Sequence, residues 1–502
     1  MTRRLRVTRE HLARFADASG DRNPLHLDED FARATPYGRC IAQGALVTTA
    51  ALGVADAETL EHVRSLQIQF KQPVFPDEEY AISLVGSGRG NVQIEVAGGG
   101  RAAAAIAVAA DSDGPRLAEP GLDASVGTRA AARRFTVEEL AAADPALDEP
   151  YACDVDALAA LAEELGAGRV PRSVLVWLAA ASYTVGMLVP GEDAVFVGAR
   201  IAPATAPRAG RLSGSVTAVD DRTGLVAVEV AVEDREASAS MVLHAFLRTR
   251  VPSPDRGSLE PHLAPSAELA GRNVLVVGGS RGLGAAVSGA FATQGATVWV
   301  GFSRSRRHAE GLRSEFGAER IRLLQFDAED SEETRTAFEE LRGEAPALDG
   351  VVLCAAPPLY ETALHPAASD ATLRFVRSSL AMTLVPLGEA LQVLAPDGWV
   401  VLVSSAGLDD PPEAWPHYAI AKAALEGAAA YCERRTGARV LVARAPRMWT
   451  DSTNTPLGRF GAIPKEQVAA AIVRWAMSAD EARPSVLTAD ELTAAALARP
   501  SA

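Results

Sequence analysis

The chain has 502 residues, of which 48% are hydrophobic and 23% charged, and its formal net charge is −15 at pH 7. A chain of this length exceeds one hydrophobic core, so we expect two to four domains of ordinary globular composition. The negative charge argues against nucleic acid or an anionic membrane as a partner.

The N-terminus begins with basic residues, but no apolar segment follows them as it would in a signal peptide. The apolar stretch Ser173–Pro190 approaches membrane-span length, but its Ser, Tyr, Thr and Gly residues indicate a buried helix instead. Four cysteines share no metal or redox spacing, so we expect buried thiols in a reducing cytoplasm and no metal site. They are Cys40, Cys153, Cys354 and Cys432.

Two segments rich in Pro, Gly, Ser and charge, 111–130 and 251–270, are typical of linkers. They predict three domains, at 1–115, 130–250 and 268–490.

The first two blocks share one order of elements. Each has an apolar helix, Ala45–Val54 or Val174–Val189, followed by strands. The predicted strands are Leu66–Phe70, Val92–Val96 and Ala104–Val108, then Val195–Ile201, Gly214–Val219, Leu225–Val232 and Ala239–Leu247. This repetition predicts a duplicated α+β fold packed as a pseudo-dimer.

The first block carries a possible acid–base pair. Asp21 and His26 lie in a stretch interrupted by Gly20 and by Asn23-Pro24. A carboxylate and an imidazole that converge on one water could add it across a polarised double bond or eliminate it. Gly44, which opens the predicted helix, can offer an N–H to an enolate oxygen.

From about Phe15 to Tyr80 this block resembles the MaoC-like (R)-specific enoyl-CoA hydratases, which have a hot-dog fold. The resemblance implies that Asp21 and His26 are catalytic, that Asn23 helps to hold the site and that Gly44 binds the substrate oxygen. Gln43 departs from the family, which usually has His before that glycine.

The second block has no matching acid–base string, so it resembles a degenerate hot dog that lines the acyl channel. Its polar candidates are Arg172, Tyr183 and Glu192, and nothing in the sequence ties them to chemistry.

The third block alternates strands and helices, which predicts a doubly wound parallel α/β sheet of the Rossmann type. The apolar strand Asn273–Val277 leads into a glycine-rich turn and then the helix Ala285–Gln294. Glycines at 278, 282 and 284 allow a tight turn and place a pyrophosphate at the helix N-terminus.

A second constellation lies downstream. Only three of the 49 basic residues are lysine, and Lys422 follows Tyr418 by four residues, on the same face of a predicted helix. An ammonium beside a phenol makes it more acidic and can relay protons. Ser405 lies 13 residues before the tyrosine. Ser, Tyr and Lys in this order indicate acid catalysis of carbonyl reduction.

Residues 271–455 resemble the short-chain dehydrogenase/reductase family, most nearly its β-ketoacyl thioester reductases. The resemblance implies a catalytic Ser405, Tyr418 and Lys422. It implies cofactor contacts from Gly278, Ser280, Arg281, Gly282, Leu283, Gly284, Ser303, Arg304, Asp327, Ala328, Ala355, Tyr418, Lys422, Pro446 and Thr450.

The cofactor is expected to be NADPH. No carboxylate follows the strand Val298–Phe302, whereas Arg304 and Arg281 could pair with a 2′-phosphate. Three positions depart from the family. The family's Asn-Asn-Ala-Gly appears as Leu353–Ala356, the relay asparagine is replaced near Ser379, and Val277 stands where threonine is common.

Together these features predict a cytoplasmic ketoreductase–dehydratase for acyl-CoA or acyl carrier protein thioesters, of the fatty-acid or polyketide type. We expect a homodimer through the reductase domain. Three alternatives stay open. They are a hydratase–dehydrogenase running in the β-oxidation direction, a reductase fused to a non-catalytic acyl-binding hot-dog pair, and a catalytically silent NADPH-binding scaffold.

Overall fold

The computed structural model describes residues 2–88, 90–121, 131–143, 146–205, 210–234, 237–478 and 485–497. The chain divides after Arg250 into two compact units. The first two predicted blocks fall in the first unit, and the third block falls in the second, apart from Thr455–Leu457, which are grouped with the first. Of the predicted linker 111–130, residues 122–130 lie outside the described residues.

The first unit contains one antiparallel ten-stranded sheet, in the order β1-β3-β4-β5-β2-β7-β10-β9-β8-β6. The first five strands are β1 (Thr2–Arg6), β3 (Glu79–Gly88), β4 (Asn91–Gly98), β5 (Arg101–Ala110) and β2 (Val63–Phe70). The other five are β7 (Ala194–Pro203), β10 (Ala239–Leu247), β9 (Leu225–Glu233), β8 (Arg211–Asp220) and β6 (Ala146–Pro150). The two predicted repeats join where β2 pairs with β7.

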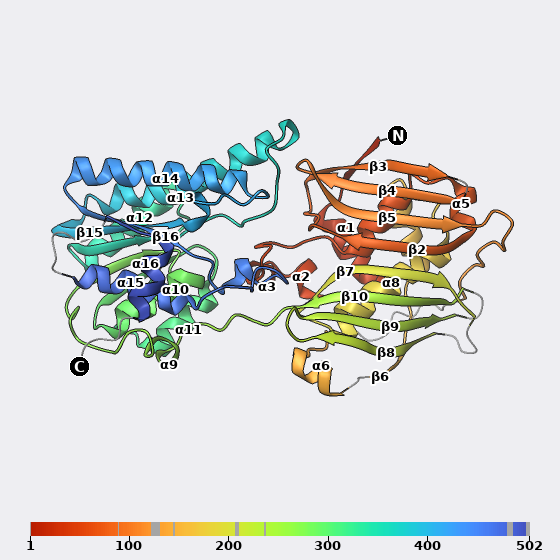
Figure 1. Ribbon diagram of the computed structural model, residues 1–502, viewed down its shortest axis with the longest axis horizontal. Coiled ribbons are helices and arrows are strands. Elements are labelled where there is room, and N and C mark those ends of the chain that lie inside the picture. Colours follow the sequence, from red (N-terminus) through yellow and green to blue (C-terminus); the bar gives the residue numbers. More distant parts are fainter. Residues whose placement is uncertain are drawn as a thin grey trace. The chain divides into compact units, whose positions relative to one another are not determined.

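Helices lie against one face of this sheet (Figure 1). They are α1 (Arg9–Ser19), α4 (Gly44–Leu52), α5 (Ala57–Glu61), α6 (Val137–Ala143), α7 (Val155–Glu164) and α8 (Arg172–Tyr183). Two short helices, α2 (Pro24–Leu27) and α3 (Glu29–Arg33), follow α1 and pack against each other. The central helices α4 and α8 are apolar nearly all round, and they contact each other inside one shared core. This all-round burial explains why their sequences carry little helical periodicity.

The second central helix differs from its predicted course. The predicted helix Val174–Val189 is α-helical only to Tyr183 and continues as a π-helical turn, Thr184–Leu188. This turn contains Gly186, whose missing side chain allows a close approach described below.

The second unit is a seven-stranded parallel sheet in the order β13-β12-β11-β14-β15-β16-β17. Its strands are β11 (Asn273–Val277), β12 (Thr297–Phe302), β13 (Ile321–Gln325), β14 (Leu348–Leu353), β15 (Leu394–Ser405), β16 (Arg439–Ala445) and β17 (Val486–Leu487). The predicted doubly wound architecture is confirmed, and its strand order reverses between β11 and β14. Ligands of such sheets bind at the carboxyl ends of the strands beside this reversal.

Helices cover both faces of the parallel sheet (Figure 1). On one face lie α9 (Arg256–Leu259), α10 (Gly282–Thr293), α11 (Arg306–Phe316), α15 (Lys465–Met477) and α16 (Ala489–Leu497). On the other lie α12 (Ser331–Glu344), α13 (Ser369–Ala390) and α14 (Pro416–Thr436). Across the described ranges, no helix combines the length and hydropathy that crossing a bilayer requires.

Candidate active sites

The carboxylate of Asp21 is buried between the two halves of the first unit. It follows α1, which ends at Gly20 in a left-handed conformation, and only 1% of Asp21 is exposed. Ser182 Oγ donates a hydrogen bond of 2.6 Å to Asp21 Oδ2, and the Asn23 N–H donates one of 3.2 Å to Oδ1. Burial raises the pKa of Asp21, against the opposing effects of the His26 charge and these hydrogen bonds.

The second, degenerate half therefore supplies part of the site. A Cβ at Gly186 would lie 2.5 Å from Asp21 Oδ1, and a Cβ at Gly20 would lie 3.2 Å from the ring of Tyr183. Sequence reasoning missed Ser182 and Gly186, because a serine and a glycine in an apolar helix carry no motif. Of the three polar candidates named in this half, only Tyr183 brings its side chain to the site, and Glu192 contributes its backbone carbonyl. Arg172 pairs with Asp156, and Glu192 pairs with Arg250.

Asn23 ties the site to the other half. Its side-chain N–H groups donate to the carbonyls of Gly186 (2.9 Å), Gly191 (3.3 Å) and Glu192 (3.2 Å). Its Oδ1 accepts from the Leu25 N–H and so caps α2. The amide thus fixes the start of the helix that carries His26.

His26 is half-buried in α2, and its Nδ1 lies 2.8 Å from the carbonyl oxygen of Ile41. A carbonyl only accepts hydrogen bonds, so Nδ1 carries a proton and Nε2 is the ring nitrogen that can take up or release another one. The two predicted groups lie near enough for the charge of His26 to lower the pKa of Asp21, so they belong to one site.

Gly44 opens α4 next to Phe70. A Cβ at Gly44 would lie 2.5 Å from Phe70 Cζ, so only glycine fits here. The first N–H groups of a helix have no partner within it and can bind an anionic oxygen. Gln43, in place of the usual His, is fully buried and donates to the Leu12 carbonyl at 3.1 Å. This bond links the start of α4 to α1.

In the second unit, the glycine-rich turn joins β11 to α10 as predicted. Gly278 and Gly282 have φ angles of 75° and 55°. A Cβ at Gly284 would lie 2.2 Å from the Gly278 carbonyl oxygen. No side-chain bond caps the start of α10 at Arg281. Because its first N–H groups lack partners within the helix, the turn fits a dinucleotide pyrophosphate.

Two other predicted cofactor segments meet this turn. A Cβ at Gly278 would lie 2.7 Å from the backbone nitrogen of Ala355. Thr450 lies in the loop after Pro446, called the late loop below. Its Cγ2 would lie 3.9 Å from a Cβ at Gly282. Within the turn, Ser280 and Leu283 are largely buried. The structure therefore brings these segments together at the carboxyl ends of the strands.

The predicted catalytic triad lies on β15 and α14. Ser405 ends β15, and its Oγ accepts a hydrogen bond of 3.0 Å from the Gly407 N–H. Tyr418 is in the first turn of α14, and the Lys422 Nζ lies 5.6 Å from the centre of its ring. Lys422 Nζ also donates to the Val403 carbonyl at 2.7 Å, which holds the ammonium beside the end of β15.

The residues expected at the adenosine end flank β12 and β13. Ser303 and Arg304 follow β12, and the Arg304 side chain is exposed. Asp327 and the mostly buried Ala328 follow β13, where Asp327 Oδ1 accepts from the Glu329 N–H. Arg281 lies 3.5 Å from Asp451 of the late loop, an ion pair that the sequence did not indicate.

Two of the departures from the family pattern are at Cys354 and Ser379. Burial raises the pKa of the Cys354 thiol to about 12, against the opposing charge of Lys422. Ser379, near the position of the relay asparagine, is buried in α13, and its Oγ has no hydrogen-bond partner among the described residues. A buried hydroxyl without a protein partner is a place where ordered water is expected.

Sequence reasoning also missed a polar network behind the triad. Arg444 on β16 binds both carboxylate oxygens of Glu426 at 2.9 and 2.8 Å, and Ser404 Oγ donates to Glu426 at 2.6 Å. Arg444 also binds Asp409, just beyond Ser405, at 2.9 Å. The network links β15, α14 and β16, and so fixes the elements that carry Ser405 and Lys422.

His417, beside the tyrosine, is a second buried feature of α14. Its ring stacks on Tyr360 and meets Phe375 edge-on. Neither ring nitrogen has a hydrogen-bond partner in the described part of the chain. Burial lowers the pKa of His417 to about 4.

Comparison with known proteins gives matches in both units. Residues 272–446 match the family described as short chain dehydrogenase, and residues 1–104 match the MaoC like domain. A cyclic-di-GMP-binding biofilm dispersal mediator protein of Escherichia coli is 31% identical over 170 residues, which span 34% of this chain and 68% of that protein.

Two solved structures are also similar. A short-chain dehydrogenase/reductase from Serratia marcescens is 22% identical, with a TM-score of 0.41, over 44% of this chain and 96% of its own. One from Mycobacterium ulcerans is 21% identical, with a TM-score of 0.40, over 45% and 90%.

Replacement of His417 by Phe tests the buried imidazole. Its pKa is about 4 when folded and 6.5 ordinarily, so between these values only the unfolded chain takes up the proton. The free energy of unfolding of the wild type, relative to His417→Phe, should therefore fall as the pH is lowered from 6.5 to 4. Urea unfolding across this range measures it. The exposed His365, replaced by Ala, is the control, and a pH-independent difference for His417→Phe would contradict the assignment.

Proposed function

Because the chain belongs to the short-chain dehydrogenase family in its second unit and carries a MaoC-like domain in its first, we propose that it is a ketoreductase–dehydratase. It reduces a 3-oxoacyl thioester to the (3R)-hydroxyacyl thioester and then removes water to give the trans-2-enoyl product. The observation that carries this proposal is the presence of two sets of candidate catalytic groups, Ser405/Tyr418/Lys422 and Asp21/His26, in one chain.

For the reduction, NADPH held at the glycine-rich turn would supply the hydride. Ser405 binds the carbonyl oxygen of the substrate, and Tyr418 donates a proton to that oxygen as negative charge develops on it. Lys422, fixed by the Val403 carbonyl, stabilises the phenolate that remains. The reduction adds one hydride to C3 and one proton to the carbonyl oxygen, and Tyr418 provides the proton.

For the dehydration, His26 Nε2 removes the proton from C2, and Asp21 protonates the leaving C3 hydroxyl. The raised pKa of the buried Asp21 suits a group that must hold a proton before it donates it. The Gly44 N–H, at the positive end of α4, binds the thioester oxygen while it carries the enolate charge.

The exposed Arg304 after β12, where no carboxylate follows the strand, supports NADPH as the cofactor. NADPH in turn favours the reductive, biosynthetic direction of the fatty-acid or polyketide type. The carrier of the acyl group is coenzyme A or an acyl carrier protein. Four unpaired cysteines support a reducing, cytoplasmic setting.

A homodimer through the reductase unit is supported by exposed apolar side chains on α13 and α14. Leu373 and Leu384 of α13 are 67% and 42% exposed, and Ile420 and Tyr431 of α14 are 46% and 68% exposed. Gly427, with open space where its Cβ would be, continues the exposed face of α14. Such a face favours contact with a second copy.

Two substitutions should separate the proposed activities. Tyr418→Phe should lower ketone reduction by about 10²- to 10⁴-fold and leave dehydration of a supplied 3-hydroxyacyl thioester intact. Asp21→Asn should do the reverse. NADPH oxidation and enoyl absorbance measure the two steps. Reduction unchanged by Tyr418→Phe would support a silent scaffold, and dehydration unchanged by Asp21→Asn would support an acyl-binding hot-dog pair.

Replacing Arg304 by Ala should lower kcat/KM for NADPH by about tenfold and leave kcat/KM for NADH nearly unchanged, because only NADPH carries the 2′-phosphate. The control is the neighbouring exposed Arg307, also replaced by Ala. A wild type that prefers NADH would contradict the reductive direction.

Replacing Tyr431 by Glu should convert the dimer to a monomer, because a carboxylate would be buried without a partner in the contact. Sedimentation velocity measures the mass. Leu364→Glu, at an exposed site outside both helices, should leave it dimeric. A wild type that sediments as a monomer would contradict the dimer.

A further inference from the structure

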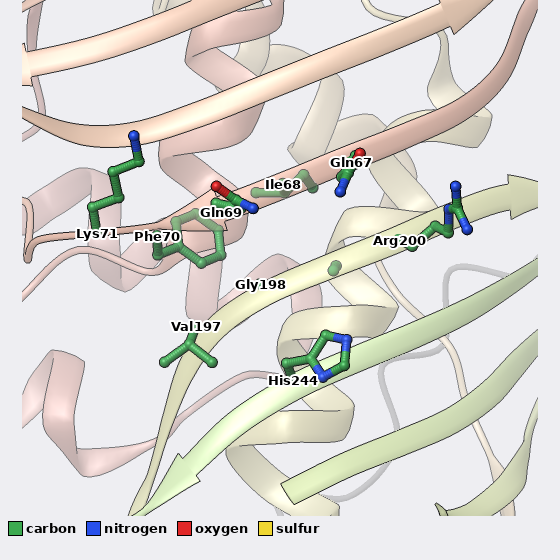
Figure 2. Close-up of a pocket in the computed structure, with 10 residues that line it drawn as sticks. Gln67, Ile68, Gln69, Phe70, Lys71, Val197, Gly198, Arg200 and His244 are labelled. Atoms are coloured by element: carbon green, nitrogen blue, oxygen red, sulfur yellow. The ribbon is translucent and has the colours of Figure 1, made fainter. Parts of the chain in front are cut away.

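A groove of about 410 Å³ lies in the first unit, where the two halves of the ten-stranded sheet join at β2 and β7. It is lined by residues of β2, β7 and β10 and by Lys71, which follows β2. Figure 2 shows Lys71 at one end of the groove and Arg200 at the other, with Gly198 between them. The volume is in the range of small-molecule sites.

Strand geometry opens the groove at this place. The pairing of β2 with β7 ends at Gln69 and Gly198. The pairing of β10 with β7 shifts by one residue after His244, which faces Gly198. Gly198 has no side chain to fill the space, and a Cβ there would lie 2.8 Å from the Ile68 carbonyl oxygen. The hollow is therefore built into the backbone.

The charge of the lining is positive, although the whole chain carries −15. The ten lining residues include Lys71, Arg200 and His244, but no carboxylate. Within the described ranges, neither Lys71 nor Arg200 forms an ion pair. Gln67 and Gln69 add amide donors on the same face. Two unpaired cations with neighbouring N–H donors suit an anion with several acceptor oxygens.

Lys71 is one of only three lysines in the chain. Lys422 belongs to the catalytic triad. Lys465 is buried and bound to Glu466 and to the Pro252 carbonyl. Lys71 alone is exposed, on a surface where every other basic side chain is arginine. A compact ammonium binds phosphate as a point charge.

The groove also borders the dehydratase site. Phe70 lines the groove, and its ring lies against Gly44, where a Cβ would come within 2.5 Å of Cζ. On the other side the ring packs on Phe196, with the centroids 5.2 Å apart. Phe70 therefore contacts both the cationic groove and the residue that opens α4.

From this juxtaposition we propose that the groove binds the phosphate-bearing end of the pantetheine arm that carries the acyl thioester. Lys71 and Arg200, at the two ends of the groove, supply the positive charge that attracts the phosphate, and the arm passes Phe70 to place its thioester at Gly44. This assignment rests on the proposed dehydratase function. The phosphate is common to coenzyme A and to acyl carrier protein, so the experiment below distinguishes these two sources.

The test compares three 3-hydroxyacyl thioesters, of coenzyme A, of acyl carrier protein and of pantetheine, which lacks the phosphate. The double variant Lys71→Ala/Arg200→Ala should lower kcat/KM for the two phosphorylated substrates by about ten- to a hundredfold, mainly through KM. It should leave the pantetheine thioester within about twofold. A loss confined to one phosphorylated substrate would identify the source. The control Arg222→Ala removes an exposed cation from the turn between β8 and β9 of the same sheet.

An equal loss for all three substrates, or no loss for any, would overturn the groove assignment. Calorimetric binding of coenzyme A, with the reductase site saturated by NADP⁺, gives a readout independent of turnover. The double variant should bind at least about tenfold more weakly than the wild type, and equal affinity would refute the site. If coenzyme A binds through these residues but no thioester is dehydrated, the proposed function fails while the groove stands.

Discussion

The burial of one carboxylate constrains the first unit more than any other feature. Asp21 is removed from water by the second half of the duplicated fold, which supplies the Ser182 hydroxyl and, at Gly186, the absence of a side chain. Asn23 binds three carbonyls of the same half. The half without the acid–base pair thus contributes to the burial that raises the pKa of Asp21, while its Ser182 hydroxyl opposes that rise.

The second unit buries a positive charge, the Lys422 ammonium, instead of a carboxylate. Lys422 is nearly buried, and it is held by the Val403 carbonyl and surrounded by elements that Arg444 and Glu426 tie together. In the proposed reaction sequence, reduction produces the 3-hydroxyacyl thioester that the Asp21 and His26 pair would dehydrate. The proposal thus offers a chemical reason for the linkage of the two units in one chain, because the product of one proposed site is the substrate of the other.

The sequence was most informative where chemistry demands fixed spacing. The positions of three short patterns in the fold could be predicted, because the residues of each lie close together in the sequence. These patterns are the glycine-rich turn, the Tyr418 and Lys422 pair, and the Asp21 and His26 string. Ser182, Gly186 and Arg444 could not be predicted, since their roles depend on contacts more than 15 residues away in the chain. The π-helical turn and the groove at Gly198 follow from strand and helix register, which one sequence does not specify.

The proposed function requires that one chain reduces and then dehydrates the same acyl group. To test this, a 3-oxoacyl thioester is supplied with NADPH that is deuterated at the transferred position, and the product masses are determined over time. We expect a 3-hydroxyacyl thioester with one deuterium at C3, followed by a 2-enoyl thioester that retains this label after losing water. A labelled hydroxyacyl thioester that never loses water, or an enoyl product without deuterium, would contradict the proposed function.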